Sequence, residues 1–158
     1  MGNNQELLME LIRQEETLQF PVFTNETALQ LGLLMVERAK EKKHAIVIDI
    51  VKNGQKLFYH ALEGTSPDNE YWVAGKARAV NRFGRSSYYV GLYWRGRGVA
   101  IDPAWPIGSD GYAPYSGSFP IIVKNAGFIG TVTVSGLTDT DDADHKFVVD
   151  CIKEFLAK

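Results

Sequence analysis

The sequence of 158 residues contains one cysteine, Cys151, which excludes a disulfide framework and a zinc site built on cysteine pairs. No apolar run comes near the ~20 residues that a membrane-spanning helix needs, so we expect no membrane partner. The first residues have neither the basic start nor the apolar stretch of a secretory signal, which predicts a reduced, cytoplasmic protein. The net charge of −2 argues against a general nucleic-acid-binding protein.

Motifs that would assign a reaction are also missing. The sequence has no nucleophile elbow, no phosphate-binding Walker loop, no dinucleotide-binding glycine fingerprint and no cysteine pair for covalent haem. The question of enzyme or non-enzyme is therefore left open by the motifs.

The hydrophobic content of 45% is that of one ordinary globular domain, and we expect a single domain over residues 1–158. Apolar residues at helical spacing predict an opening helix, a second helix from Thr24 or Asn25 to about Lys43 that is largely buried, and a closing helix. Another helix is expected from Ser66 to Gly84, with Trp72, Ala79 and Phe83 directed inward, and a short one from Ser87. Strands are predicted at 45–51, 55–62, 119–124 and 128–135, with a long loop over 102–118.

The first two strands flank Asn53-Gly54, a strong signal for a two-residue hairpin turn. With that turn, Asp49 lies opposite Phe58 and shares one face of the sheet with His60. The two side chains could then form an acid–base or metal-binding pair, or a plain surface contact. Paired hairpins separated by helices predict an α+β fold, with an antiparallel sheet and helices on one side of it.

Basic residues are concentrated in one segment without acids. Residues 71–101 hold six basic residues and no acid, which gives this segment a net charge of +6. Because the net charge of the whole chain is −2, the remaining residues together carry a net charge of −8. The six are Lys76, Arg78, Arg82, Arg85, Arg95 and Arg97. Guanidinium groups beside aromatic rings bind planar anions, but they also pair with acids from elsewhere in the fold or from a second subunit. Single-stranded nucleic acid would use the same residue types, and the acidic remainder disfavours it.

A second cluster combines acids with a histidine, namely Asp139, Asp141, Asp142, Asp144 and His145. It does not match a calcium-binding loop, because the sixth position is Asp144 rather than glycine. The acids are typical of a helix start, whereas His145 is also a candidate ligand or acid–base group.

Two segments carry a family resemblance. The first is Lys76-Ala-Arg-Ala-Val-Asn-Arg-Phe-Gly-Arg85, and the second is Phe119-Pro-Ile-Ile-Val with Gly130 and Val134-Ser-Gly136 after it. Together they resemble the GlcG/HbpS-like family, the group labelled haem-degrading domain. The resemblance is stronger to a microbial branch of this family, for which it implies no defined activity. The strings that carry it are Asn69-Glu-Tyr-Trp72, Arg82-Phe-Gly-Arg-Ser-Ser87, Ser118-Phe-Pro-Ile121 and Gly130-Thr-Val-Thr-Val-Ser-Gly136. The resemblance covers about residues 25–157.

The resemblance implies a profilin-like α+β fold, in which helices pack on a mostly antiparallel sheet, and assembly into a homo-oligomer. It also implies haem or iron binding in some relatives. The resemblance also implies a His-Gly-Gly-Ser run before Phe-Pro-Ile, whereas this sequence has Pro114-Tyr-Ser-Gly-Ser118 there. A haem or metal contact by that histidine would be lost here.

We therefore expect a cytoplasmic homo-oligomer that binds a small planar or anionic ligand, with haem as the most concrete candidate. Arg82 and Arg85 would hold carboxylates, Trp72 and Phe83 would form an apolar wall, and Asp144 or His145 could reach the iron. The full set of candidate ligand-binding residues is Trp72, Lys76, Arg78, Arg82, Phe83, Arg85, Ser118 and Phe119. The candidate metal ligands are His60, Asp144 and His145.

Two alternatives remain. One is a non-catalytic interaction or assembly protein whose aromatic and arginine side chains are buried against neighbouring subunits or a client protein. The other is an enzyme acting on a small anionic metabolite, with His60 or His145 as the acid–base group.

Overall fold

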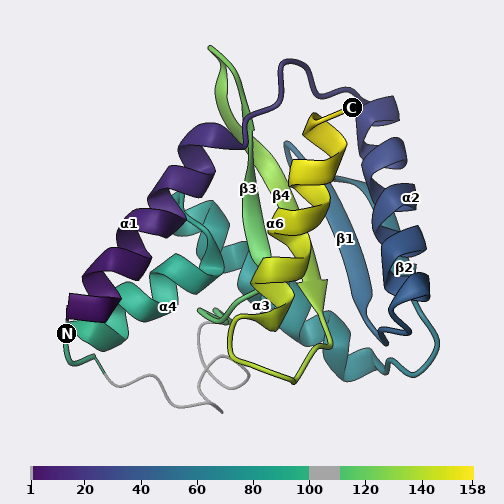
Figure 1. The fold of residues 1–158 in the computed structure, drawn as a ribbon. Coiled ribbons are helices and arrows are strands. Elements are labelled where there is room, and N and C mark those ends of the chain that lie inside the picture. The colour runs from purple at the N-terminus through teal and green to yellow at the C-terminus, as the bar shows by residue number, and fades with distance from the viewer. Residues whose placement is uncertain (1, 100–110) are drawn as a thin grey trace.

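The computed structural model describes residues 2–99 and 111–158, in which five helices pack on a four-stranded antiparallel sheet (Figure 1). The strand order is β2-β1-β4-β3. The elements are α1 (Gly2–Thr17), α2 (Asn25–Glu41), β1 (Val47–Lys52), β2 (Gln55–Ala61), α3 (Pro67–Phe83), α4 (Ser87–Gly96), β3 (Ser118–Val123), β4 (Gly127–Ser135) and α6 (Ala143–Leu156). The predicted α+β class is confirmed.

The helix ends follow local side-chain chemistry. Thr24 caps α2 and exchanges hydrogen bonds with Thr27, which satisfies backbone donors of the first turn. Proline occupies the first position of α3, where its missing N–H costs nothing. Gly84 ends the same helix with φ of 68°, a conformation that glycine adopts without strain. These starts and stops lie where the sequence predicts them.

Helices cover both faces of the sheet, so the prediction that they lie on one side is wrong. Helices α2 and α6 pack on one face, and α3 packs on the other, mainly against β4 and β3 (Figure 1). Helix α4 packs against α1 and α3 beyond the β3 edge. The part of the second face on β3 and β4 carries Ser118, Thr131, Thr133 and Ser135, and such a polar pattern is typical of a solvated face.

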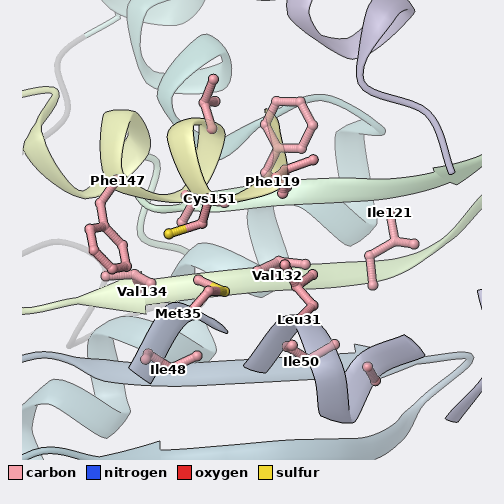
Figure 2. Close-up of a cluster of buried hydrophobic side chains, with 14 of the residues drawn as sticks. Leu31, Met35, Ile48, Ile50, Phe119, Ile121, Val132, Val134, Phe147 and Cys151 are labelled. Carbon is pink, nitrogen blue, oxygen red and sulfur yellow. The ribbon is translucent and has the colours of Figure 1, made fainter. Parts of the chain in front are cut away.

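The hydrophobic core lies between the sheet and the α2–α6 layer. Figure 2 shows Leu31 and Met35 of α2 and Phe147 and Cys151 of α6 gathered around the sheet residues Ile48, Ile50, Val132 and Val134. Every one of these side chains is buried, and so is Phe119 on β3. Phe119 is therefore a core residue, and its predicted contact with a ligand finds no geometric support.

On the opposite face, polar side chains of β3 and β4 are buried beneath α3 and α4. The hydroxyls of Ser118 and Thr133 lie 2.8 Å apart, and the backbone N–H of Ser118 donates to Ser87 at 2.9 Å. Ser118 and Thr133 are both fully buried. Ser118, a predicted ligand-binding residue, thus connects β3 to β4 and to α4.

The β1–β2 hairpin has the predicted turn, but its register corrects the predicted Asp49–His60 pair. Asn53 and Gly54 both have positive φ, as a two-residue turn requires. A bulge leaves Leu57 without a partner on β1, so that Asp49 lies opposite Tyr59 and His60 lies opposite Ile48. A one-residue shift moves side chains to the other face of the sheet. Buried Asp49 pairs instead with Lys56, at 2.8 Å.

Two burial predictions are also wrong. Leu29 and Leu33 of α2 are 40% and 49% exposed, so this helix is buried on one stripe only, and Phe83 of α3 is 39% exposed. Residues 102–110 of the predicted loop lie outside the described residues. Its described end, from Gly111, packs on α3: the N–H of Ala113 donates to Gly75, where a Cβ atom would lie 2.8 Å from that of Ala113. None of the described helices is long and apolar enough to span a membrane.

Candidate functional site

A cleft of about 550 Å³ lies between the first half of α3 and the connection from β4 to α6. It includes three of the predicted site residues, Trp72, Lys76 and Asp144. The residues that line it are Asp68, Asn69, Trp72, Lys76, Tyr115, Ser116, Ser135, Gly136, Leu137, Thr138, Asp139, Thr140, Asp141 and Asp144. The volume is within the range of small-molecule sites.

Lys76 and Asp144 form a buried ion pair in the wall of this cleft. The ammonium of Lys76 lies 2.9 Å from Asp144 and also donates to the carbonyl of Val134 at 3.2 Å. The other carboxylate oxygen of Asp144 accepts the N–H of Leu137 at 3.0 Å. Burial lowers the pKa of Lys76, and the charge of Asp144 opposes that effect. The pair fixes α3 to the start of α6 and so sets the width of the cleft.

Two aromatic rings form another part of the wall. The rings of Trp72 and Tyr115 meet edge to face, with centroids 5.8 Å apart. The indole N–H of Trp72 donates to Asp68, one turn earlier on α3, at 3.2 Å. The indole is thus held in place, which favours stacking against a flat ligand.

The cleft is acidic, contrary to the predicted anion-binding site. Four carboxylates line it, against the single ammonium of Lys76, which Asp144 already neutralises. The other three are those of Asp68, Asp139 and Asp141. A cleft lined by one sign of charge concentrates ligands of the opposite sign. The electrostatics therefore favour neutral or cationic ligands.

Arg85 is held by an acid of α1, not by the cleft. Its guanidinium lies 2.9 Å from Glu15, whose second oxygen accepts the N–H of Ser86 at 3.0 Å. Glu15 is buried, and this burial raises its pKa, while Ser86 and Arg85 oppose the rise. For Arg85, therefore, the second interpretation of the basic segment 71–101 holds, because this arginine pairs with an acid from elsewhere in the fold.

Arg78 and Arg82 lie on the exposed side of α3. Arg78 donates to the carbonyl of Gly111 at 3.1 Å, and Arg82 lies 5.0 Å from the ring of Phe83 and 5.2 Å from that of Tyr112. Trp72 and Phe83 are eleven residues apart on one helix, which is ~16 Å at 1.5 Å per residue. The two rings therefore do not form one wall, and the predicted arginines do not converge on the cleft.

The candidate metal ligands are also separated. His145 is buried against α1, with Nε2 2.8 Å from the side-chain oxygen of Gln14, and burial lowers its pKa to about 4. His60 is exposed on β2 and borders a second hollow of about 410 Å³, together with His44. Only Asp144 lies in the first cleft. Within residues 2–99 and 111–158, no three His, Cys, Asp or Glu side chains are grouped to hold a metal ion.

Sequence reasoning does not assign several of the cleft residues to a ligand site. Tyr115 lies in a loop without periodicity, and Asp68 is an ordinary acid in the first turn of a helix. Asp139 and Asp141 match a common helix start. The signal that could have indicated the cleft is the short distance in sequence between the end of a predicted strand, Ser135-Gly136, and the acids Asp139 and Asp141.

The fold and the cleft define an α+β protein with a helix-covered antiparallel sheet and a polar ligand-sized site beside a buried ion pair. A family model described as "Haem degrading protein HbpS-like" matches residues 23–153, and the chain belongs to this family. The family resemblance seen in the sequence is confirmed.

Individual proteins agree with this assignment. A UPF0303 protein from Streptomyces coelicolor is 43% identical over 149 residues, which are 94% of this chain and 93% of that protein. The crystal structure of the Ybr137w protein has a TM-score of 0.81 and 28% identity, covering 95% of this chain and 87% of that one. The structure of a PduOC:haem complex has a TM-score of 0.65 at 15% identity, covering 86% and 94%, which shows a common fold alone.

Proposed function

We propose that this protein binds a small planar ligand in the cleft between α3 and the β4–α6 connection. The observation that carries the proposal is the placement of the Trp72 and Tyr115 rings in the same cleft as the Lys76–Asp144 pair. A mostly preformed concave site with apolar rings and a few placed polar groups is the usual form of a small-molecule site.

The lining selects the chemistry of the ligand. Three carboxylates, those of Asp68, Asp139 and Asp141, would accept hydrogen bonds or face a positive charge. The face of an indole attracts cations as well as flat rings. We therefore propose a planar molecule that is neutral or cationic in the part that enters the cleft. This revises the anionic ligand predicted from the arginine segment.

Haem is the group that the family suggests. The family description names haem degradation, and one structural neighbour is titled as a haem complex. The described residues of this cleft do not fit it. They include no histidine, cysteine or methionine to bind the iron, and the ring of Tyr115, the remaining haem-ligand type in the lining, is packed against Trp72. The propionates would face carboxylates. Haem binding at the cleft is therefore not part of the proposal, and haemin serves as a test compound.

The test is a thermal-shift screen of flat metabolites of each charge class, with haemin included. A ligand at a hundredfold excess over its Kd adds about 2.7 kcal/mol, which corresponds to a rise in Tm of about 5–10 °C for a chain of this size. We expect the neutral and cationic compounds to give this rise with the wild type and with Tyr71→Ala, whose side chain is exposed on the same helix.

Trp72→Ala is the informative variant, because it removes the indole without touching the ion pair. We expect it to abolish the ligand-induced rise in Tm. An equal rise in Trp72→Ala and the wild type would contradict the assignment to this cleft. Stabilisation by haemin and other dianions alone would contradict the proposed ligand class.

We also propose that the protein is a cytoplasmic homo-oligomer, as the sequence predicts. Support comes from large apolar side chains that stay exposed in the single chain, above all Met9 and Val22 at 61% and 60% and Leu33 at 49%. Homodimer interfaces are more apolar than the rest of a protein surface, so a subunit contact would cover such side chains. Sedimentation equilibrium of the full chain tests this, and a monomer at all concentrations would contradict it.

A further inference from the structure

The end of α3 and the exposed side of α4 form a surface of guanidinium groups and aromatic rings, away from the cleft. We call it the arginine–ring surface. It consists of Arg78, Arg82, Phe83, Tyr93, Trp94 and Arg97. All of its arginines are exposed, and Phe83 is 39% exposed.

Contacts connect the residues of this surface from Arg82 to Arg97, and Arg78 lies one helical turn before Arg82 on α3. The guanidinium of Arg82 lies over the ring of Phe83, and the centroid of that ring is 6.2 Å from that of Trp94. Trp94 meets Tyr93 edge to face at 5.1 Å, and the guanidinium of Arg97 lies 4.5 Å from the centre of the Tyr93 ring. Because each ring holds a neighbouring group, the surface is ordered before any partner arrives, which lowers the entropic cost of binding.

The arginines of this surface have no acidic partner in the part of the chain that the structure describes. There, Arg78, Arg82 and Arg97 have no carboxylate within 4.0 Å. Arg13, Arg38 and Arg85, which lie elsewhere, each pair with at least one glutamate. The guanidinium groups of Arg82 and Arg97 lie over rings, and that of Arg78 donates to the carbonyl of Gly111. A guanidinium has five N–H donors, so each keeps donors for an external acceptor.

We propose that the arginine–ring surface binds a short acidic peptide segment of a partner protein, with apolar side chains between its acids. Carboxylates pair with guanidinium groups in a bidentate geometry, and exposed aromatic rings are frequent anchors of apolar partner side chains. This proposal is independent of ligand binding in the cleft.

Other partners fit the observations less well. Two copies that met face to face through this surface would place like charges against each other, since residues 71–101 contain no acid. A long nucleic acid would extend past this surface onto the rest of the protein, whose residues outside 71–101 carry a net charge of −8. Its phosphates would be repelled there. A short acidic segment covers the surface and ends within it.

The test is selection of a random dodecapeptide library on the full-length protein, followed by affinity measurement for the enriched peptides. We expect enriched peptides to be rich in Asp and Glu with apolar residues between them. The double variant Arg78→Gln/Arg82→Gln should lose about tenfold or more in affinity. Arg82→Lys should lose part of it, since lysine keeps the charge but stacks poorly.

Arg13→Gln is the matched control, because Arg13 is exposed on α1 and pairs only with Glu10 in the described residues. Its affinity should equal that of the wild type. The proposal is overturned if no peptide is enriched, if the enriched peptides have no excess of acids, or if the double variant binds as the control does. Tighter binding of single-stranded RNA would assign the surface to nucleic acid, and self-association lost in the double variant would assign it to a second copy; either result overturns the proposal.

Discussion

Lys76 of α3 and Asp144 of α6 are 68 positions apart in the chain, and they meet as a buried ion pair 2.9 Å long. Each has a second hydrogen bond to backbone, so that neither charge is buried without a partner. The pair holds two helices from opposite faces of the sheet at one end of the cleft. Its loss should affect both stability and cleft shape.

Lys76→Met should destabilise the fold by about 3–5 kcal/mol, because it leaves the carboxylate of Asp144 buried and uncompensated. The double variant Lys76→Met/Asp144→Asn should regain most of this loss, since Asn keeps an oxygen for the N–H of Leu137. Urea denaturation measures both free energies of unfolding. If the single and double variants were equally unstable, the ion pair would not be the cause.

Arg85→Gln should cost about 1–3 kcal/mol, because buried Glu15 then keeps only its bond from the backbone of Ser86. The double variant Glu15→Gln/Arg85→Gln should recover part of the loss. The measurement is again urea denaturation, with ligand affinity as a second readout. A loss of ligand affinity at unchanged stability would instead restore Arg85 as a ligand-binding residue.

His145 should make the fold sensitive to acid. Burial lowers its pKa to about 4 in the folded protein, whereas an unfolded chain has the ordinary histidine pKa of 6.5. The unfolded state therefore binds more protons between these values, and stability falls as the pH is lowered from 6.5 to 4, by about 3 kcal/mol in total.

His145→Gln isolates this effect, because glutamine does not titrate. Glu15, whose pKa is raised, titrates in the opposite sense in both proteins and cancels in the difference. The wild type should lose stability relative to the variant as the pH falls through this window, as followed by urea denaturation at each pH. Parallel curves for the two proteins would show that His145 is not the titrating group.

Gly32→Ala should destabilise the protein although it places a better helix former in α2. The added Cβ atom would lie 2.4 Å from the ring of Phe58, so that this ring must move away from the helix. Overpacking costs about 1–3 kcal/mol, and the gain in helix propensity is at most about 1 kcal/mol.

Gly96→Ala at the end of α4 is the control for that substitution. The nearest atom to its Cβ is 3.6 Å away, at the side chain of Asn4. This variant should be neutral or slightly stabilising in thermal unfolding. A stabilising effect of Gly32→Ala as well would mean that Phe58 moves without cost.

Much of the fold could be predicted because its signals are local. Thr24, Ser66-Pro67 and Gly84 set helix ends through capping chemistry, and Asn53-Gly54 sets a turn through its positive φ. The register of the first hairpin could not be predicted, because the bulge at Leu57 has no such local signal. That single extra residue separates Asp49 from His60.

The candidate site was predictable only in part. Trp72, Lys76 and Asp144 are among the predicted residues and do meet, but through contacts between α3 and α6 that no spacing reveals. The clustering of the arginines is visible in the sequence. Sequence could not show that Arg85 would face Glu15 while Arg78 and Arg82 point away from the cleft.

The sequence by itself determined the elements, their order, the α+β class and the charge asymmetry of the chain, because capping, turn chemistry and periodicity act over a few residues. Only the tertiary structure decided that α3 covers the face of the sheet that carries Thr and Ser side chains, and that Lys76 of α3 forms a buried ion pair with Asp144. Burial decides the behaviour of such groups, and burial depends on elements distant in the chain. The same acids that look like a helix start therefore become the lining of a cleft.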